Sequence, residues 1–66
     1  MNKYNFVELK KIDSDTWQFI TTDNKCGKHF FVKVINKLGE IVMYKEVTKE
    51  LGNHFYKRCR TQGYTR

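Results

Sequence analysis

Two cysteines and two histidines are the side chains of this sequence that could hold a metal ion. Cys26 and His29 are separated by two residues, and His54 and Cys59 by four. Tetrahedral zinc takes thiolate and imidazole ligands that converge from two elements, so a pair in a loop and a pair on a helix could share one ion. The spacing matches no familiar zinc finger, and a thiol on an apolar stripe packs as a small hydrophobic group. We therefore expect no metal and no other cofactor, with Cys26, His29, His54 and Cys59 kept as a zinc alternative.

Catalytic chemistry has little support in the sequence. His29 and His54 could in principle act as an acid and base pair on RNA, with Lys25 or Lys28 binding a phosphate. No motif fixes these roles, and the four glycines stand singly instead of forming a phosphate-binding loop. A chain of 66 residues can barely form one core, which leaves little room for a catalytic pocket. We expect a protein that is not an enzyme.

Positive charge gathers at the C-terminal end. The formal net charge is +6, and residues 1–56 supply only +2 of it, from nine lysines against seven acids. The other four charges belong to residues 57–66, and no acidic residue follows Glu50. A concentrated cationic surface attracts polyanions, and tyrosines beside it can stack on exposed bases. The pattern favours nucleic acid, DNA or RNA, as the partner.

Phosphate contacts would supply most of the affinity of such a protein, so low sequence specificity and steep salt dependence are expected. Removing Arg58, Arg60 and Arg66 together should reduce the slope of log K against log salt by the amount that about three phosphate contacts contribute. The alternative is a solvated helix face whose cations only complement the negative end of the helix dipole. The predicted nucleic-acid-binding residues are Lys49, Asn53, Tyr56, Lys57, Arg58, Arg60, Tyr64 and Arg66.

These residues must be positioned by a small number of strands and one helix. Residues 4–12 and Thr16–Thr22 read as strands, and the second places Trp17 and Phe19 on one face and Ile20 on the other. Asp and Ser at 13–15 favour a turn between them, and residues 23–28 favour a loop. Trp17 is expected to belong to the core, as aromatic residues of small domains usually do.

A β-hairpin over residues 29–46 is the clearest local signal. Asn36 and Gly39 suit a type I turn closed by a left-handed glycine, and a pairing of Asn36 with Glu40 would place Val34 opposite Val42. Both faces of this hairpin are then largely apolar, and a single helix can cover only one of them.

The uncovered face provides a second functional hypothesis. The sequence has no Ala or Pro and is rich in Lys, Asn and Ile, a composition that suits a small genome such as that of a phage or plasmid. A protein of this origin could use the uncovered face and a basic rim to bind and inhibit one host protein with an acidic surface. A homodimer through the same face is also possible. The predicted interface residues are Phe31, Ile35, Ile41 and Met43.

A C-terminal helix is predicted from apolar residues that recur every four positions. Thr48 could cap its start and Gly63 could end it, whereas Gly52 would weaken it by up to about 1 kcal/mol relative to Ala. A short helix, a turn at Gly52 and a basic second helix is the alternative, in the manner of helix-turn-helix DNA-binding proteins. The stripe expected to face the core is Val47, Leu51, Phe55 and Cys59.

The sequence therefore predicts one small basic domain, residues 1–66, of the α+β class. Three or four antiparallel strands form a meander, and one C-terminal helix packs on one sheet face. No secretion signal or membrane span is recognisable, so a cytoplasmic location without membrane contact is expected. Cys26 and Cys59 would then remain reduced.

Overall fold

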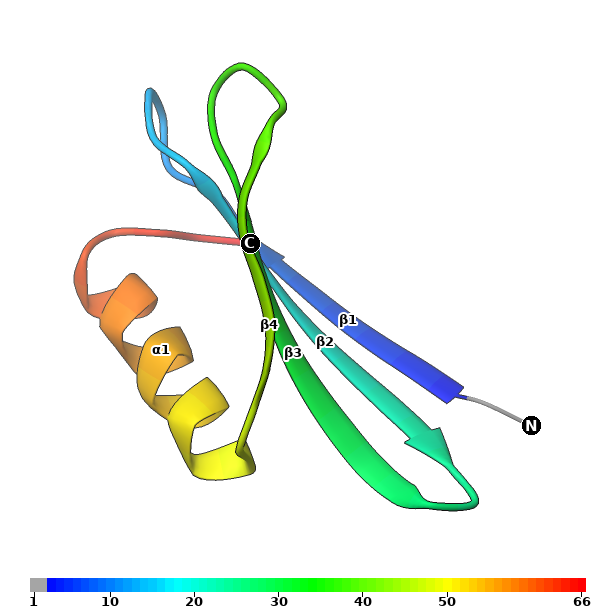
Figure 1. Ribbon diagram of the computed structural model, residues 1–66. Helices are drawn as coiled ribbons and strands as arrows, with labels where there is room; N and C mark the ends of the chain where they lie inside the picture. The colour runs from blue at the N-terminus through cyan, green and yellow to red at the C-terminus, as the bar shows by residue number, and fades with distance from the viewer. Residues whose placement is uncertain (1–2) are drawn as a thin grey trace.

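Four antiparallel strands and one helix make up the fold, which a computed structural model describes for the backbone of residues 3–66 and the side chains of residues 6–23 and 25–66. The strands lie in chain order in a single sheet, and the helix packs on one face of it (Figure 1). The elements are β1 (Lys3–Leu9), β2 (Thr16–Asn24), β3 (Gly27–Ile35), β4 (Ile41–Val47) and α1 (Lys49–Thr61). This arrangement confirms the predicted meander with one C-terminal helix.

The pleat of the strands divides their side chains between a face covered by α1 and an open face. Trp17 pairs with Leu9 on one side and Val34 on the other, and Phe19 likewise pairs with Val7 and Val32. These residues lie on the covered face, so the predicted split of Trp17 and Phe19 from Ile20 is confirmed. The long β2–β3 hairpin projects away from α1, which contributes to an elongated shape of 39 × 23 × 17 Å.

The hairpin turn forms as predicted, but β4 pairs with β3 in a register that differs from the predicted one. Asn36 Oδ1 accepts from the backbone N–H groups of Leu38 and Glu40, each at 2.9 Å, and Gly39 adopts a φ of 84°. A bulge at Val34/Ile35 then shifts the pairing, so that Val34 faces Met43 instead of Val42. Ile41 still pairs with Ile35 as predicted, but the one-residue shift sends the side chains of residues 43–47 to the face opposite the predicted one. Met43 therefore lies on the covered face.

The core is small and consists of two clusters between the sheet and α1. In the first, Leu9 is fully buried beside Cys59 and Tyr64. Val32, Val34 and Val47 form the second. Half-buried aromatic residues surround both clusters and join α1 to β2: Trp17 lies 5.7 Å from Phe55 between ring centroids, and Phe19 lies edge-on to Tyr56 at 5.5 Å.

Both ends of α1 are fixed by the residues that the sequence indicates. Thr48 Oγ1 accepts from the Leu51 N–H at 3.1 Å, which caps the first turn. At the other end Gly63 has a φ of 96°, and the Tyr64 N–H donates to the Cys59 carbonyl at 3.0 Å in a Schellman motif. The helix runs unbroken through Gly52, so the helix-turn-helix alternative is wrong. Among residues 3–66, no helix has the length and apolar character that a membrane crossing requires.

The predicted core-facing stripe of α1 is wrong at Leu51, which is 40% exposed. Four residues span 400° of an α-helix, so a strict four-residue repeat turns by about 40° per step, and a stripe that faces the sheet at Cys59 has turned by about 80° at Leu51. Val47 belongs to β4, and so the stripe starts outside the helix. The side of α1 that meets the sheet is instead Gly52, Phe55, Tyr56 and Cys59.

Alanine at Gly52 within α1 and at Gly63 just beyond its end should change stability in opposite directions. At Gly63 a Cβ is strained because of the positive φ, so Gly63→Ala is expected to cost about 1 kcal/mol. At Gly52 a Cβ would meet Val47 Cγ2 at 3.6 Å, an ordinary contact, so Gly52→Ala should stabilise the protein by up to about 1 kcal/mol. Urea denaturation of both variants tests this, and two shifts of the same sign would contradict it.

Candidate nucleic-acid interface

The cations of α1 occupy two different sides of the helix. Steps of 100° per residue bring Lys49, Lys57 and Arg60 to one side, together with Asn53, whereas Arg58 points about 160° away from Arg60. All five side chains are exposed. We call Lys49, Lys57 and Arg60 the basic flank. Glu50, in the first turn, is the one acidic residue of the helix.

The basic flank is not neutralised by the protein itself. Among side chains of residues 6–23 and 25–66, the ion pairs are Lys10 with Glu8 at 3.2 Å and His29 with Glu46 at 2.8 Å. Neither pair involves α1 or any arginine. The three charges are therefore available to an external anion.

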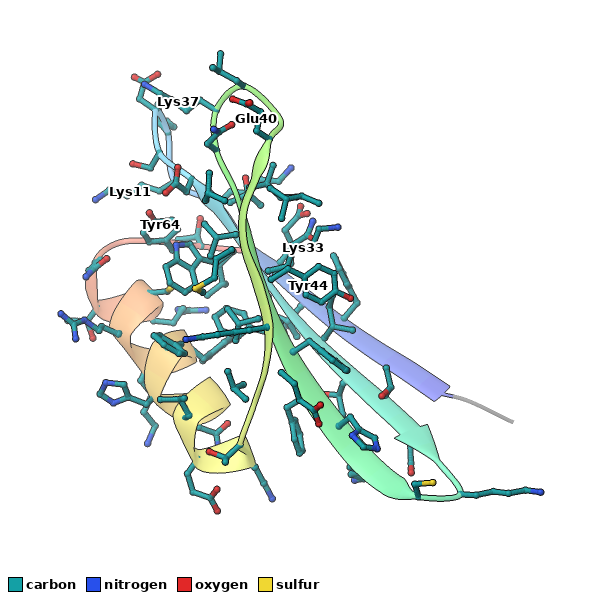
Figure 2. The ribbon with its side chains drawn as sticks, in the orientation of Figure 1. Lys11, Lys33, Lys37, Glu40, Tyr44 and Tyr64 are labelled. Atoms are coloured by element: carbon teal, nitrogen blue, oxygen red, sulfur yellow. The ribbon has the colours of Figure 1, made fainter. Side chains whose placement is uncertain are left out.

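The structure does not place both predicted tyrosines where a base could stack on them. Tyr64 is only 8% exposed and packs with Leu9 and Cys59, so the prediction that it stacks on a base is wrong. Figure 2 shows its ring between the end of α1 and the sheet. Tyr56 is half-buried against Phe19 and faces the sheet, not the outer wall of the helix. The predicted surface therefore keeps its cations and loses its stacking partners.

The two remaining arginines lie apart from the basic flank. Arg58 borders a hollow of about 250 Å³ that Trp17 and Phe55 also line. Arg66 follows Thr65, whose backbone pairs with Lys10 through hydrogen bonds of 2.7 and 2.9 Å at the end of β1. Removal of Arg58, Arg60 and Arg66 would thus take charges from three separate places.

Two further cations on the same side of the sheet were missed in the sequence. Lys45 Nζ lies 5.8 Å from the centroid of the Phe55 ring, and Lys11 Nζ lies 5.8 Å from that of Tyr64. A cation over an aromatic face is held in place without losing its charge. Lys45 pairs with Val32 on the covered face, so the correct β4 register would have revealed it.

A groove separates the N-terminal half of α1 from the sheet. Its volume is about 180 Å³. The floor comes from β1, β2 and β3, and the wall comes from the helix and the end of β4. Lys49 lines the groove and also belongs to the basic flank. The other lining residues are Val7, Phe19, Ile20, Thr21, Phe30, Phe31, Val32, Val47, Gly52, Asn53 and Tyr56.

The open face of the sheet carries the exposed aromatic residues. Phe31 lies edge-on to Tyr44, 6.1 Å between centroids, and Lys33 Nζ lies 5.6 Å from the centre of the Tyr44 ring. Figure 2 shows Lys33 and Tyr44 on the side of the sheet opposite Tyr64. Of the four predicted interface residues, Phe31, Ile35 and Ile41 lie on or beside this face and Met43 does not. On this face Phe6 and Tyr44 expose more than half of their surface, as do Ile41 and Val42 at the start of β4.

Charges of both signs accompany these apolar side chains. Glu8 accepts a 2.8 Å hydrogen bond from Gln18 Nε2. That bond first, and then Lys10, hold the pKa of the Glu8 carboxyl below its usual range, so it stays ionised near neutral pH. His29 and Glu46 pair nearby. The open face is therefore mixed in charge, whereas α1 is strongly basic.

The four residues of the zinc alternative are dispersed. Cys26 is exposed at the tip of the β2–β3 hairpin, while Cys59 is buried under α1. His54 is exposed on α1, and His29 lies on the open face beside Glu46. Within the part of the chain whose side chains are described, no three His, Cys, Asp or Glu residues gather as a metal site would require.

Cys59 should react with thiol reagents far more slowly than Cys26. Burial keeps reagents away from the Cys59 thiol. It also raises the pKa of this thiol, so less of the reactive thiolate is present. Because the folded protein favours the neutral Cys59 thiol, burial of this group contributes to stability below pH 9.0, the ordinary pKa of the thiol. The contribution declines as the pH rises above that value. We expect one fast and one slow thiol in a native labelling time course, and falling stability above about pH 9. Two equally fast thiols would contradict the packing.

Comparison with known proteins finds no family model, no curated protein and no solved structure that matches this chain. The functional conclusion therefore depends on the surfaces described above.

Proposed function

We propose that this protein binds nucleic acid without catalysis, through the side of the molecule that carries α1. The basic flank of Lys49, Lys57 and Arg60 contacts backbone phosphates. The observation that carries the proposal is that no carboxylate among the described side chains pairs with these cations. Each cation that meets a phosphate releases a condensed counterion, which favours binding at low salt.

The arrangement of these cations supports a polyanion as partner. Lys49 and Arg60 are separated by about 16 Å along the helix axis, given a rise of 1.5 Å per residue. Lys57 lies between them, so the flank is a row and not a single point charge. A row of cations suits a ligand with repeated negative charges. Lys45 and Lys11 extend the positive potential on the same side of the sheet.

Phosphate contacts carry no base information, so mixed-sequence DNA and RNA should bind with similar affinity. Fluorescence anisotropy with labelled random oligonucleotides of both kinds, at low salt, tests the proposal directly. Polyglutamate of equal charge is the control, because it matches the charge without the spacing and geometry of phosphates. Saturable binding of the oligonucleotides in the presence of excess polyglutamate supports the proposal, and binding that polyglutamate abolishes contradicts it.

A second candidate function belongs to the open face, where exposed apolar side chains favour a protein partner. Phe6 and Tyr44 are each more than half exposed on this face, and α1 covers the opposite one. An inhibitor of a host protein, or a homodimer, would use this face. Because the face holds charges of both signs and the strongest positive charge lies on the side of α1, the partner need not be acidic.

Tyr44→Ala is expected to weaken any protein partnership by more than tenfold, since Tyr44 is an exposed aromatic residue of this face and tyrosines are enriched among residues that dominate binding energy. Leu38→Ala is the matched control, because Leu38 is an exposed apolar residue at the hairpin tip, outside the patch. Sedimentation of the purified protein measures self-association, and affinity capture with both variants measures other partners. Equal effects of the two variants would exclude the open face.

A further inference from the structure

We propose that the groove between α1 and the sheet receives one unstacked base of a single-stranded nucleic acid whose phosphates lie on the basic flank. This inference rests on the proposed function and assigns it a substrate class, single-stranded DNA or RNA. It depends on three features: the lining of the groove, its size and its position beside the cations.

The lining suits a planar ring with polar edges. Phe19, Phe30 and Tyr56 supply aromatic surface, and every base offers a π-face to such side chains. Thr21, Asn53 and Tyr56 are lining residues whose side chains carry hydrogen-bonding groups. Among the described side chains, none of these three takes part in a side-chain hydrogen bond, so each is available to the edge of a base. An apolar hollow with a few polar groups is typical of a small-molecule site.

The size of the groove fits one ring system. Its volume of about 180 Å³ is close to that of a cavity of about 150 Å³ that binds a benzene ring. Gly52 contributes to this space because it carries no side chain, and a Cβ there would point to within 3.6 Å of Val47 Cγ2. A glycine that weakens the helix thus allows a hollow to remain between helix and sheet.

The position of the groove favours a polymer over a free nucleotide. Lys49 belongs both to the groove and to the basic flank, so a base in the groove places its own phosphate near Lys49. Lys57 and Arg60 then continue the row of cations past the groove, where a mononucleotide has no further charge to offer. A duplex keeps its bases stacked and paired, and would have to pay the cost of flipping one out. A single strand presents an unstacked base without that cost.

The test compares a labelled 12-nucleotide pyrimidine strand, as DNA and as RNA, with an abasic strand of the same length and with a duplex. Anisotropy at low salt should show that the wild-type protein binds the base-bearing strands about five- to a hundredfold more tightly than the abasic strand. Gly52→Leu, which fills the groove, should reduce this preference to less than twofold. The salt dependence of its binding should stay unchanged, because the cations remain.

Asn53→Leu provides a second variant at an exposed helix position, should the larger side chain at position 52 disturb folding. It removes one hydrogen-bonding group from the wall and is expected to lower the preference two- to fivefold. Equal affinity of the wild-type protein for base-bearing and abasic strands would overturn the inference and leave phosphate binding intact. Loss of the preference in Tyr44→Ala but not in Gly52→Leu would place the base on the open face, which also overturns it. Absence of binding to every strand would reject the proposed function itself.

Discussion

Replacing Lys49, Lys57 and Arg60 together by glutamine is expected to weaken nucleic-acid binding by roughly a thousandfold at about 50 mM salt. Each lost phosphate contact lowers the slope of log K against log salt by about 0.7 to 0.9, so three contacts lower it by about 2 to 3. Glutamine keeps the length and helix propensity of the side chains, so α1 should remain folded. Anisotropy titrations of the triple variant and the wild type, over a range of salt concentrations, measure both quantities.

A second triple variant separates the position of the charges from their number. Lys25 and Lys28 are exposed at the end of the β2–β3 hairpin, and Lys37 is exposed at the tip of the β3–β4 hairpin. Both hairpin ends lie away from α1 (Figure 1). Replacement of these three lysines by glutamine removes the same net charge but should weaken binding less than tenfold, through the general field of the protein alone. If both triple variants lose affinity equally, binding depends on net charge and the basic flank is not an interface.

Leu9→Ala should have the largest effect on stability, about 2 to 5 kcal/mol. Leu9 is fully buried and packs β1 against Cys59 and Tyr64, so the truncation leaves a cavity between β1 and the C-terminal segment. A domain of this size has a total stability of roughly 3 to 10 kcal/mol, and much of it would be lost. Urea denaturation followed by the fluorescence of Trp17, which packs against the same cluster, measures the change.

Leu38→Ala is the control of the same residue type. Leu38 is 83% exposed at the tip of the β3–β4 hairpin, so its truncation should change the free energy of unfolding by less than about 0.5 kcal/mol. Similar losses in the two variants would mean that β1 does not pack under the C-terminal segment as described.

The sequence predicts those parts of the fold that depend on neighbouring residues. Asn36 and Gly39 specify their turn through contacts within five residues, and Thr48 and Gly63 specify the ends of α1 in the same way. Such short-range signals act alike in any fold, so they can be recognised before the structure is known. The order of the strands follows from short connections between them.

Features that depend on distant parts of the chain were not predicted. The bulge at Val34/Ile35 is a tertiary adjustment of two paired strands, and it moved Met43 and Lys45 to the side of α1. The burial of Tyr64 depends on the Schellman turn, which returns the chain to β1 for pairing with Lys10. The sequence therefore indicated which element carries the cations, but not which of them form one row.

The salt dependence of wild-type binding to a mixed-sequence single strand tests the central claim most directly. Three phosphate contacts on a single strand predict that log K falls against log salt with a slope of about −2, and each further contact steepens it by about 0.7. A slope of −2 or steeper agrees with binding through the basic flank. A slope near zero, or no measurable binding at low salt, would contradict the claim that this side of the molecule binds phosphates.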